Sequence, residues 1–218
     1  MAESKILLVH MYGFTFPEGT KCPCLTIETG LIYHWLKEYW REYDQIVLLG
    51  GWICDRKRGW FMPDRPTSAE VVKTLLLDDC SLAAARFFTQ FDLDCGHIQP
   101  ARDTMEEADL GLHILQALTG QDPRSVPFEA LCLRFHKPRV ELIWKSRKAS
   151  CQEVRGVPLP SWKLWFQLLP RILQEPVGLW ITAKDPLGQG QFFSNLRGNR
   201  THNCAQHYHK VVSPDDWR

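Results

Sequence analysis

The 218-residue chain lacks an apolar run of membrane-spanning length, and the run from Ile6 to Val9 is too short for the core of a secretory signal peptide. It also lacks an excess of charge of either sign. The formal net charge is +1, so the surface as a whole has no strong attraction to nucleic acid or to an anionic membrane. These absences predict a soluble cytoplasmic protein with no membrane segment and no nucleic-acid partner.

The common motifs of nucleotide and metal chemistry are absent as well. The sequence contains no P-loop, no nucleophile elbow and no metal-binding triad. Gly50-Gly51 is a bare pair with no helix directly after it, so it does not match the dinucleotide-binding fingerprint. Eight cysteines are present, but without a secretory signal, and with several inside apolar runs, they are expected to be reduced.

Short apolar segments alternate with segments of helical periodicity, an order typical of a parallel sheet covered by helices. This predicts an α/β fold, a three-layer Rossmann-like sandwich with a mostly parallel central sheet, over residues 1–184, followed by a polar C-terminal tail over residues 185–218. We expect Ile6–Val9, Ile46–Leu49 and Leu131–Phe135 to lie parallel in one sheet. The expected strands are Lys5–His10, Gln45–Leu49, Gly96–Gln99, Phe128–Phe135 and Ser150–Pro160.

The expected helices begin near Leu25, Thr67, Thr104 and Pro138, and two more are expected at Leu82–Phe91 and Trp162–Leu173. Pro176 and Gly178 are expected to end the last of these, because proline removes a helical hydrogen bond and glycine favours other conformations.

The stretch from Phe128 to Lys145 joins a buried strand to a helix and carries the clearest candidate site. Pro138 suits the first helical position, which places His136 in the strand-to-helix turn and Arg139 in the first helical turn. A cation near a helix N-terminus is unfavourable unless an anion lies beside it. The spacing therefore allows an anion site at Arg139, or alternatively a turn closed by His136 with Arg139 directed at a surface carboxylate.

Two further helix starts carry polar residues that could reach the same edge of the sheet. Thr67 and Glu70 fit a capping box, and so do Thr104 and Glu107. The side chains of each pair could cap the helix, contact a ligand in the site, or do both. The carboxyl ends of parallel strands and the starts of the following helices share one rim, so these residues should lie near His10 and His136.

Two segments gather side chains that could bind ligands. The loop Trp52–Pro66 interleaves basic and aromatic residues, and it could either stack a base and hold a phosphate or pack as a solvated loop. His202, Cys204, His207 and His209 crowd the tail, but their spacing matches no zinc template. We therefore expect no metal site.

The run from Arg134 to Val140, RFHKPRV, resembles the strand-end "H-x-P-R-A" signature of the YdcF-like proteins, a bacterial family of unknown function that includes SanA-like and ElyC-like envelope proteins. Further pieces in the family's order are Lys5–His10, Leu49-Gly50-Gly51, Ser68-Ala69-Glu70, Thr104 to Glu107 and Val154 to Pro160. The chain departs from the family at Val140, at Glu107, where asparagine is frequent, and at Glu28, near which relatives carry an arginine.

The resemblance implies a Rossmann-like fold, and it implies that Ser68 and Glu70 point into the site. It also suggests S-adenosylmethionine as a ligand, since one relative is reported to bind it. Two hypotheses follow: a binding protein for a small nucleotide-like or phosphate-bearing anion, or an enzyme, a hydrolase or transferase, acting on such a molecule. The predicted catalytic residues are His136 and Glu70, and the predicted ligand-binding residues are Gly50, Gly51, Ser68, Thr104 and Arg139.

Overall fold

The computed structural model describes residues 4–11, 14–15, 24–50, 54–55, 60–61, 67–79, 86–89, 91–93, 101 and 103–195. Within these ranges, five strands form one parallel sheet in the order β7-β4-β1-β8-β9. They are β1 (Ile6–His10), β4 (Gln45–Leu49), β7 (Phe87–Phe88), β8 (Phe128–Leu133) and β9 (Cys151–Val157). The predicted α/β class with a parallel sheet is confirmed.

Two short antiparallel pairs lie outside this sheet. They are β2 (Phe14–Thr15) with β3 (Cys24–Leu25), and β5 (Cys54–Asp55) with β6 (Trp60–Phe61).

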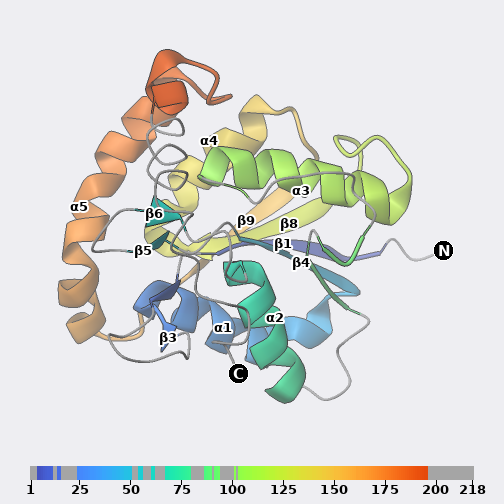
Figure 1. Ribbon diagram of the computed structural model, residues 1–218, viewed down its shortest axis with the longest axis horizontal. Helices are drawn as coiled ribbons and strands as arrows, with labels where there is room; N and C mark the ends of the chain where they lie inside the picture. Colours follow the sequence, from blue (N-terminus) through green and yellow to red (C-terminus); the bar gives the residue numbers. More distant parts are fainter. Residues whose placement is uncertain are drawn as a thin grey trace, which may run out of the picture.

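Helices cover both faces of the sheet, as Figure 1 shows, with α1 and α2 on one side and α3 and α4 on the other. The helical segments are α1 (Ile27–Tyr39), η1 (Trp40–Glu42), α2 (Ser68–Asp79), α3 (Thr104–Thr119), η2 (Arg134–His136), α4 (Lys137–Ser146) and α5 (Trp162–Lys184). Helix α5 belongs to neither layer and runs along one flank of the molecule (Figure 1).

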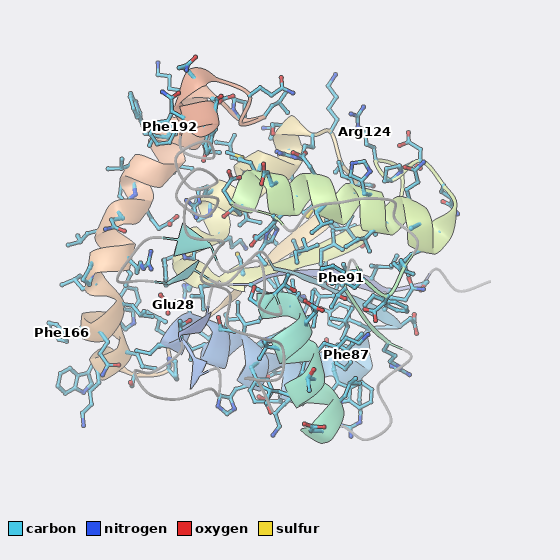
Figure 2. The ribbon with its side chains drawn as sticks, in the orientation of Figure 1. Glu28, Phe87, Phe91, Arg124, Phe166 and Phe192 are labelled. Carbon is cyan, nitrogen blue, oxygen red and sulfur yellow. The ribbon has the colours of Figure 1, made fainter. Side chains whose placement is uncertain are left out.

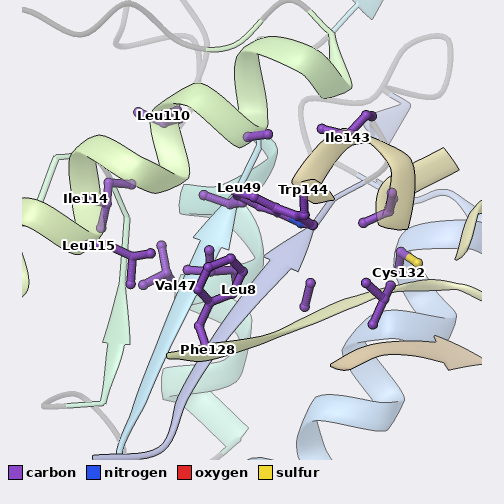
Figure 3. Packing of buried hydrophobic residues seen from close by; sticks show 14 of the residues in the cluster. Leu8, Val47, Leu49, Leu110, Ile114, Leu115, Phe128, Cys132, Ile143 and Trp144 are labelled. Atoms are coloured by element: carbon purple, nitrogen blue, oxygen red, sulfur yellow. The ribbon is translucent and has the colours of Figure 1, made fainter. Parts of the chain in front are cut away.

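The side chains of each strand alternate between the two faces of the sheet, and this divides the core into two clusters. In β1, Leu7 and Val9 pack with α1 and α2, whereas Ile6 and Leu8 pack with α3 and α4. Figure 3 shows the second cluster, in which Trp144 from α4 lies over the sheet. Successive side chains of a strand point to opposite faces, so a parallel strand covered on both faces is mostly apolar, as β1 is from Ile6 to Val9.

Two predictions about strands were wrong. Strand β8 ends at Leu133, and residues 134–136 form the 3₁₀ turn η2, because the chain must leave the sheet before helix α4 can start. Phe87 and Phe88, predicted as helix, form β7, which pairs with β4 through Ile46 and Val47. Phe87 is fully buried, so pairing and burial outweigh the local helical pattern. The predicted strand Gly96–Gln99 lies outside the described residues.

The predicted end of the last helix was also wrong, since α5 continues through Pro170 and Pro176 to Lys184. Both prolines face solvent, where water can satisfy the carbonyls whose helical bonds they remove. Burial of Leu168 and Thr182 holds the opposite side of the helix against the domain.

The first residues after α5 fold back onto the domain. Phe193 is buried in the core cluster under α3 and α4, and Arg147 donates hydrogen bonds to the carbonyls of Met105 and Pro186. None of the helices in the described ranges is long and apolar enough to cross a bilayer.

Candidate functional site at the carboxyl edge of the sheet

The candidate site lies where the strand order changes direction. Strands β4 and β7 extend the sheet on one side of β1, and β8 and β9 extend it on the other, so the gap beyond the ends of β1 and β8 is the switch point at which ligands bind in open α/β sheets. Helix α5 contacts both η2 and α4, the segments that follow β8. The residues at the end of β8 are therefore enclosed between α4 and α5.

Glu175 of α5 joins the two residues that the sequence singled out here. Its Oε1 lies 2.6 Å from Nδ1 of His136 and 3.4 Å from Nη2 of Arg139. The side chains of His136 and Glu175 are 8% and 14% exposed, so the pair is largely withdrawn from water. A carboxylate therefore occupies the place at which the sequence allowed either a bound anion or a partner for Arg139.

The hydrogen bonds define the protonation of His136. A 2.6 Å contact with a carboxylate requires a proton on Nδ1. Nη2 of Arg139 lies 3.4 Å from the same Nδ1, but both atoms carry protons, so this contact joins two donors. Both donors point to one oxygen of Glu175. Burial lowers the pKa of His136, and the carboxylate of Glu175 opposes this effect without reversing it. The neutral ring with Nδ1–H is the favoured form.

The polar groups of this cluster are not fully used. Oε2 of Glu175 and Nε of Arg139 are buried, and within the described structure neither has a hydrogen-bond partner. An orphaned buried donor or acceptor costs about 1–3 kcal/mol. Gly178 also lies against the guanidinium, since a Cβ built on it would approach Nη1 of Arg139 to 2.9 Å. The guanidinium of Arg139 therefore lies against Gly178 of α5, and its Nε–H is still available as a donor.

A second buried polar cluster ends β1. Nδ1 of His10 lies 3.0 Å from Oε2 of Glu107 in α3, and Trp144 Nε1 donates to His10 Nε2 at 3.2 Å. The indole N–H can only donate, so Nε2 must accept and Nδ1 must carry the proton given to Glu107. His10 is fully buried, although its place at a strand end predicted that it would open onto the site. Burial raises the pKa of Glu107, and the hydrogen bond from His10 only partly offsets it.

Helix α5 also reaches the other face of the sheet. Nε of Arg171 lies 3.7 Å from Oε1 of Glu28, which is buried in the first turn of α1. Helix α5 is therefore held by charged contacts to α1 on one side and to η2 and α4 on the other.

The residues predicted beyond β4 are close together, and their contacts are structural. A Cβ on Gly50 would meet Oγ of Ser68 at 2.4 Å and the backbone N of Ala69 at 2.6 Å, so glycine is needed for α2 to start against the strand end. Thr67 and Glu70 form the predicted capping box: Thr67 N donates to Glu70 Oε2 at 2.8 Å, and Glu70 N donates to Thr67 Oγ1 at 3.3 Å. A catalytic role for Glu70 and a ligand contact for Ser68 stay predictions.

The second predicted capping box was wrong. The N-cap of α3 is Asp103, whose carboxylate accepts from the N–H groups of Met105 and Glu106. The stronger cap one residue earlier leaves Glu107 free to face His10, and it puts Thr104 at the first helical position. A ligand contact for Thr104 stays a prediction.

Several predicted residues lie outside the described ranges. They are Gly51, most of the loop Trp52–Pro66, and the tail residues His202, Cys204, His207 and His209. In the part of the chain that is described, no three potential metal ligands gather.

One signal in the sequence could have identified Glu175. It is the only acidic residue between Trp162 and Lys184, and a lone acid in an apolar segment usually has a buried partner. Ending the helix at Pro176 obscured this signal. Comparison with protein-family models, curated proteins and solved structures found no match to this chain.

Proposed function

We propose that the protein binds a small phosphate-bearing, nucleotide-like anion at the carboxyl edge of the sheet, between the ends of β1 and β8, and that it is a YdcF-like protein. The observation that carries this proposal is the carboxylate of Glu175 held between His136 and Arg139. His136 and Arg139 direct their donors at one anionic oxygen, and they lie beside the switch point of the sheet.

A ligand phosphate would replace Glu175 Oε1 against the two donors. It offers more acceptor oxygens than a carboxylate, so one of them can also take the unused Nε–H of Arg139. The planar guanidinium suits a pair of oxygens, which a lysine ammonium cannot match. The position of Arg139 in the first turn of α4 adds the favourable field of the helix N-terminus to the same ligand.

The test is a melting-temperature screen of the full chain with AMP, ATP, glucose 6-phosphate and S-adenosylmethionine. A ligand present at about 100 times its dissociation constant adds about 2.7 kcal/mol of stability. We expect at least one phosphate compound to raise the melting temperature of the wild type, and Arg139→Lys to reduce that rise.

The matched control is Arg171→Lys, which changes an arginine of α5 that pairs with Glu28. It should leave the shift intact. The absence of a shift with any compound, or equal shifts in both variants, would argue against an anion site at Arg139.

A catalytic role is the second candidate, and the pairing of His136 with Glu175 favours it. Because Nδ1–H is held by the carboxylate and burial lowers the pKa of His136, the ring is unprotonated on Nε2 and can act as a general base. Asparagine keeps an N–H donor in place of Nδ1–H but has no basic nitrogen, so His136→Asn should spare binding of the screened ligand and abolish its turnover, measured by chromatography of the products. Turnover that persists in this variant would exclude His136 as the base.

A further inference from the structure

Helix α5 is apolar on the side that faces solvent. Along its length, large apolar side chains recur every three or four residues and stay exposed, with Trp162, Phe166 and Leu173 each about two-thirds exposed. Figure 2 shows Phe166 on the outer side of the helix, away from the rest of the molecule. The exposed stripe consists of Trp162, Trp165, Phe166, Leu169, Leu173, Val177 and Trp180.

Helix α5 does not need the exposed stripe in order to stay attached to the domain. The inner side already anchors the helix through Leu168 and Thr182, and Glu175 joins it to His136 and Arg139. Exposed single apolar residues are ordinary on proteins, but a contiguous apolar patch of this length indicates an interaction surface.

The charges of α5 restrict what can cover the stripe. Its basic residues are Lys163, Arg171 and Lys184, and its one acid, Glu175, is turned inward onto His136. Arg171 is directed to Glu28, which leaves Lys163 and Lys184, one near each end of the stripe, as the charges that a partner would meet. An exposed surface of tryptophan, phenylalanine and leucine flanked by lysines complements an anionic, partly apolar partner.

From this surface we infer that α5 docks the protein on an anionic phospholipid bilayer, with the helix lying in the plane of the membrane interface. Tryptophan favours the headgroup level, phenylalanine and leucine enter the acyl boundary, and lysines meet the lipid phosphates. The helix does not need to cross the bilayer, and no described helix is able to.

A second copy of the chain fits this surface less well. If two α5 helices packed through their stripes in antiparallel order, Lys163 of each copy would lie within about two helical turns of Lys184 of the other. In parallel order, each lysine would lie beside its own counterpart. Both arrangements bring like charges together while an apolar interface forms, which costs stability. The inference is independent of the anion site, because the stripe and the site lie on opposite sides of the same helix.

The test is sedimentation of the full chain with vesicles of phosphatidylcholine alone and of phosphatidylcholine with about one-third phosphatidylserine. We expect binding to the vesicles that contain phosphatidylserine and much weaker binding to the neutral ones. Replacing Phe166, Leu173 and Trp180 together by serine should lower the partition coefficient by at least about tenfold. Lys163→Gln and Lys184→Gln should each lower it about fivefold on anionic vesicles only.

The matched control is Phe91→Ser, which removes an aromatic ring that is 55% exposed and lies beyond β7, the strand at the far edge of the sheet. It should bind vesicles as the wild type does. Circular dichroism of the triple variant shows whether it remains folded, and the two lysine variants test the inference even if it does not.

Two results would overturn the inference. One is equal sedimentation with and without vesicles of either composition. The other is a dimer of the wild type in analytical ultracentrifugation that the triple variant converts to monomer without any vesicle binding, which would assign the stripe to a second copy.

Discussion

Strand β8 has a buried charged cluster near each end, and the two clusters differ in how completely the oxygens of the central carboxylate are paired. Near its start, Glu129 receives Tyr43 Oη at 2.7 Å and Lys5 Nζ at 3.4 Å, one on each carboxylate oxygen. Arg155 Nε lies 2.6 Å from the same oxygen as Tyr43, off the direction of a hydrogen bond, so that contact is ionic. Beyond its end, Glu175 has one oxygen shared by His136 and Arg139 and the other without a partner in the described structure.

The difference separates a cluster that stabilises the fold from one that is available for binding. Burial acts to raise the pKa of Glu129, but the hydrogen bond from Tyr43 and the charge of Arg155 outweigh it and hold the pKa below its usual value. At the carboxyl edge, burial prevails at Glu107, whose pKa is raised. The amino edge therefore favours its ionised carboxylate, whereas the carboxyl edge disfavours the charged form of Glu107 and leaves Oε2 of Glu175 without a hydrogen-bond partner in the described structure.

The largest predicted effect is on stability at the amino edge. Glu129→Ala should lower the free energy of unfolding by about 2 to 3 kcal/mol, because it leaves the buried hydroxyl of Tyr43 without its acceptor and removes the nearest carboxylate from Arg155. Urea unfolding measures this, and ligand binding should be unchanged. Glu153→Ala is the matched control: Glu153 contacts the same Arg155 at 3.4 Å but is 54% exposed, so its loss should cost less than about 1 kcal/mol.

The lowered pKa of Glu129 also predicts a pH dependence. A carboxyl group with a lower pKa in the folded state contributes stability above its unfolded value, and that contribution is lost as the pH falls through the folded value. The stability difference between wild type and Glu129→Ala should therefore be complete above the usual value of 4.5 and shrink in more acidic solution. A difference that does not change with pH would show that packing, not charge, accounts for the effect.

The second prediction concerns the internal carboxylate at the other edge. Glu175→Gln should raise the affinity for the anionic ligand about tenfold, because it removes the anion that competes for Arg139. The free protein should lose about 1 to 3 kcal/mol of stability, since the largely buried cation keeps only a neutral oxygen there. Titration calorimetry and urea unfolding measure the two effects. Weaker binding in this variant would mean that Glu175 contacts the ligand instead of competing with it.

The third prediction concerns Glu107, whose effect on stability should change with pH in the opposite direction to that of Glu129. Burial raises the pKa of Glu107 in the folded protein, so ionisation of Glu107 destabilises the fold. This loss of stability begins as the pH rises through the pKa of the unfolded state and is complete above the pKa of the folded state. Glu107→Gln keeps an acceptor for His10 and removes this cost. The free energy of unfolding of the variant should therefore increase relative to that of the wild type as the pH rises, as measured by urea unfolding. Glu107→Leu leaves His10 without an acceptor and should destabilise the protein at every pH.

The smallest predicted effect is at Gly178. A Cβ there would touch Nη1 of Arg139, so Gly178→Ala should displace the guanidinium and reduce ligand affinity a few-fold. The same change should leave stability equal or raise it by up to about 1 kcal/mol, because alanine favours the helix. A loss of both stability and affinity would show that the backbone of α5 cannot accommodate the methyl group.

The central part of the fold could be predicted from the sequence because its signals are local. Strand β1 is apolar from Ile6 to Val9, β4 begins and ends where the pattern indicated, and Pro138 marks the start of α4. The capping box of Thr67 and Glu70 depends on residues three apart, and it is present.

The rest depended on contacts distant in sequence. Phe87 becomes a strand because β4 pairs with it, and α5 survives two prolines because its inner side is buried against the domain. The position of Arg139 followed from the strand-to-helix pattern, but its partner Glu175 is 36 residues further along the chain. His10 and Glu107, which are 97 residues apart, are likewise a pair distant in sequence. No spacing rule predicts such pairs, because they are set by how the helices pack on the sheet.

The claim that the edge beyond β8 is an anion site occupied by an internal carboxylate is tested most directly by the order of three affinities. In calorimetric titrations, the phosphate compound that gives the largest thermal shift should bind most tightly to Glu175→Gln, less tightly to the wild type and most weakly to Arg139→Lys. Equal affinities in all three proteins, or a strong loss of melting temperature in Arg139→Ala with binding unchanged, would contradict the account and make Arg139 and Glu175 a structural ion pair.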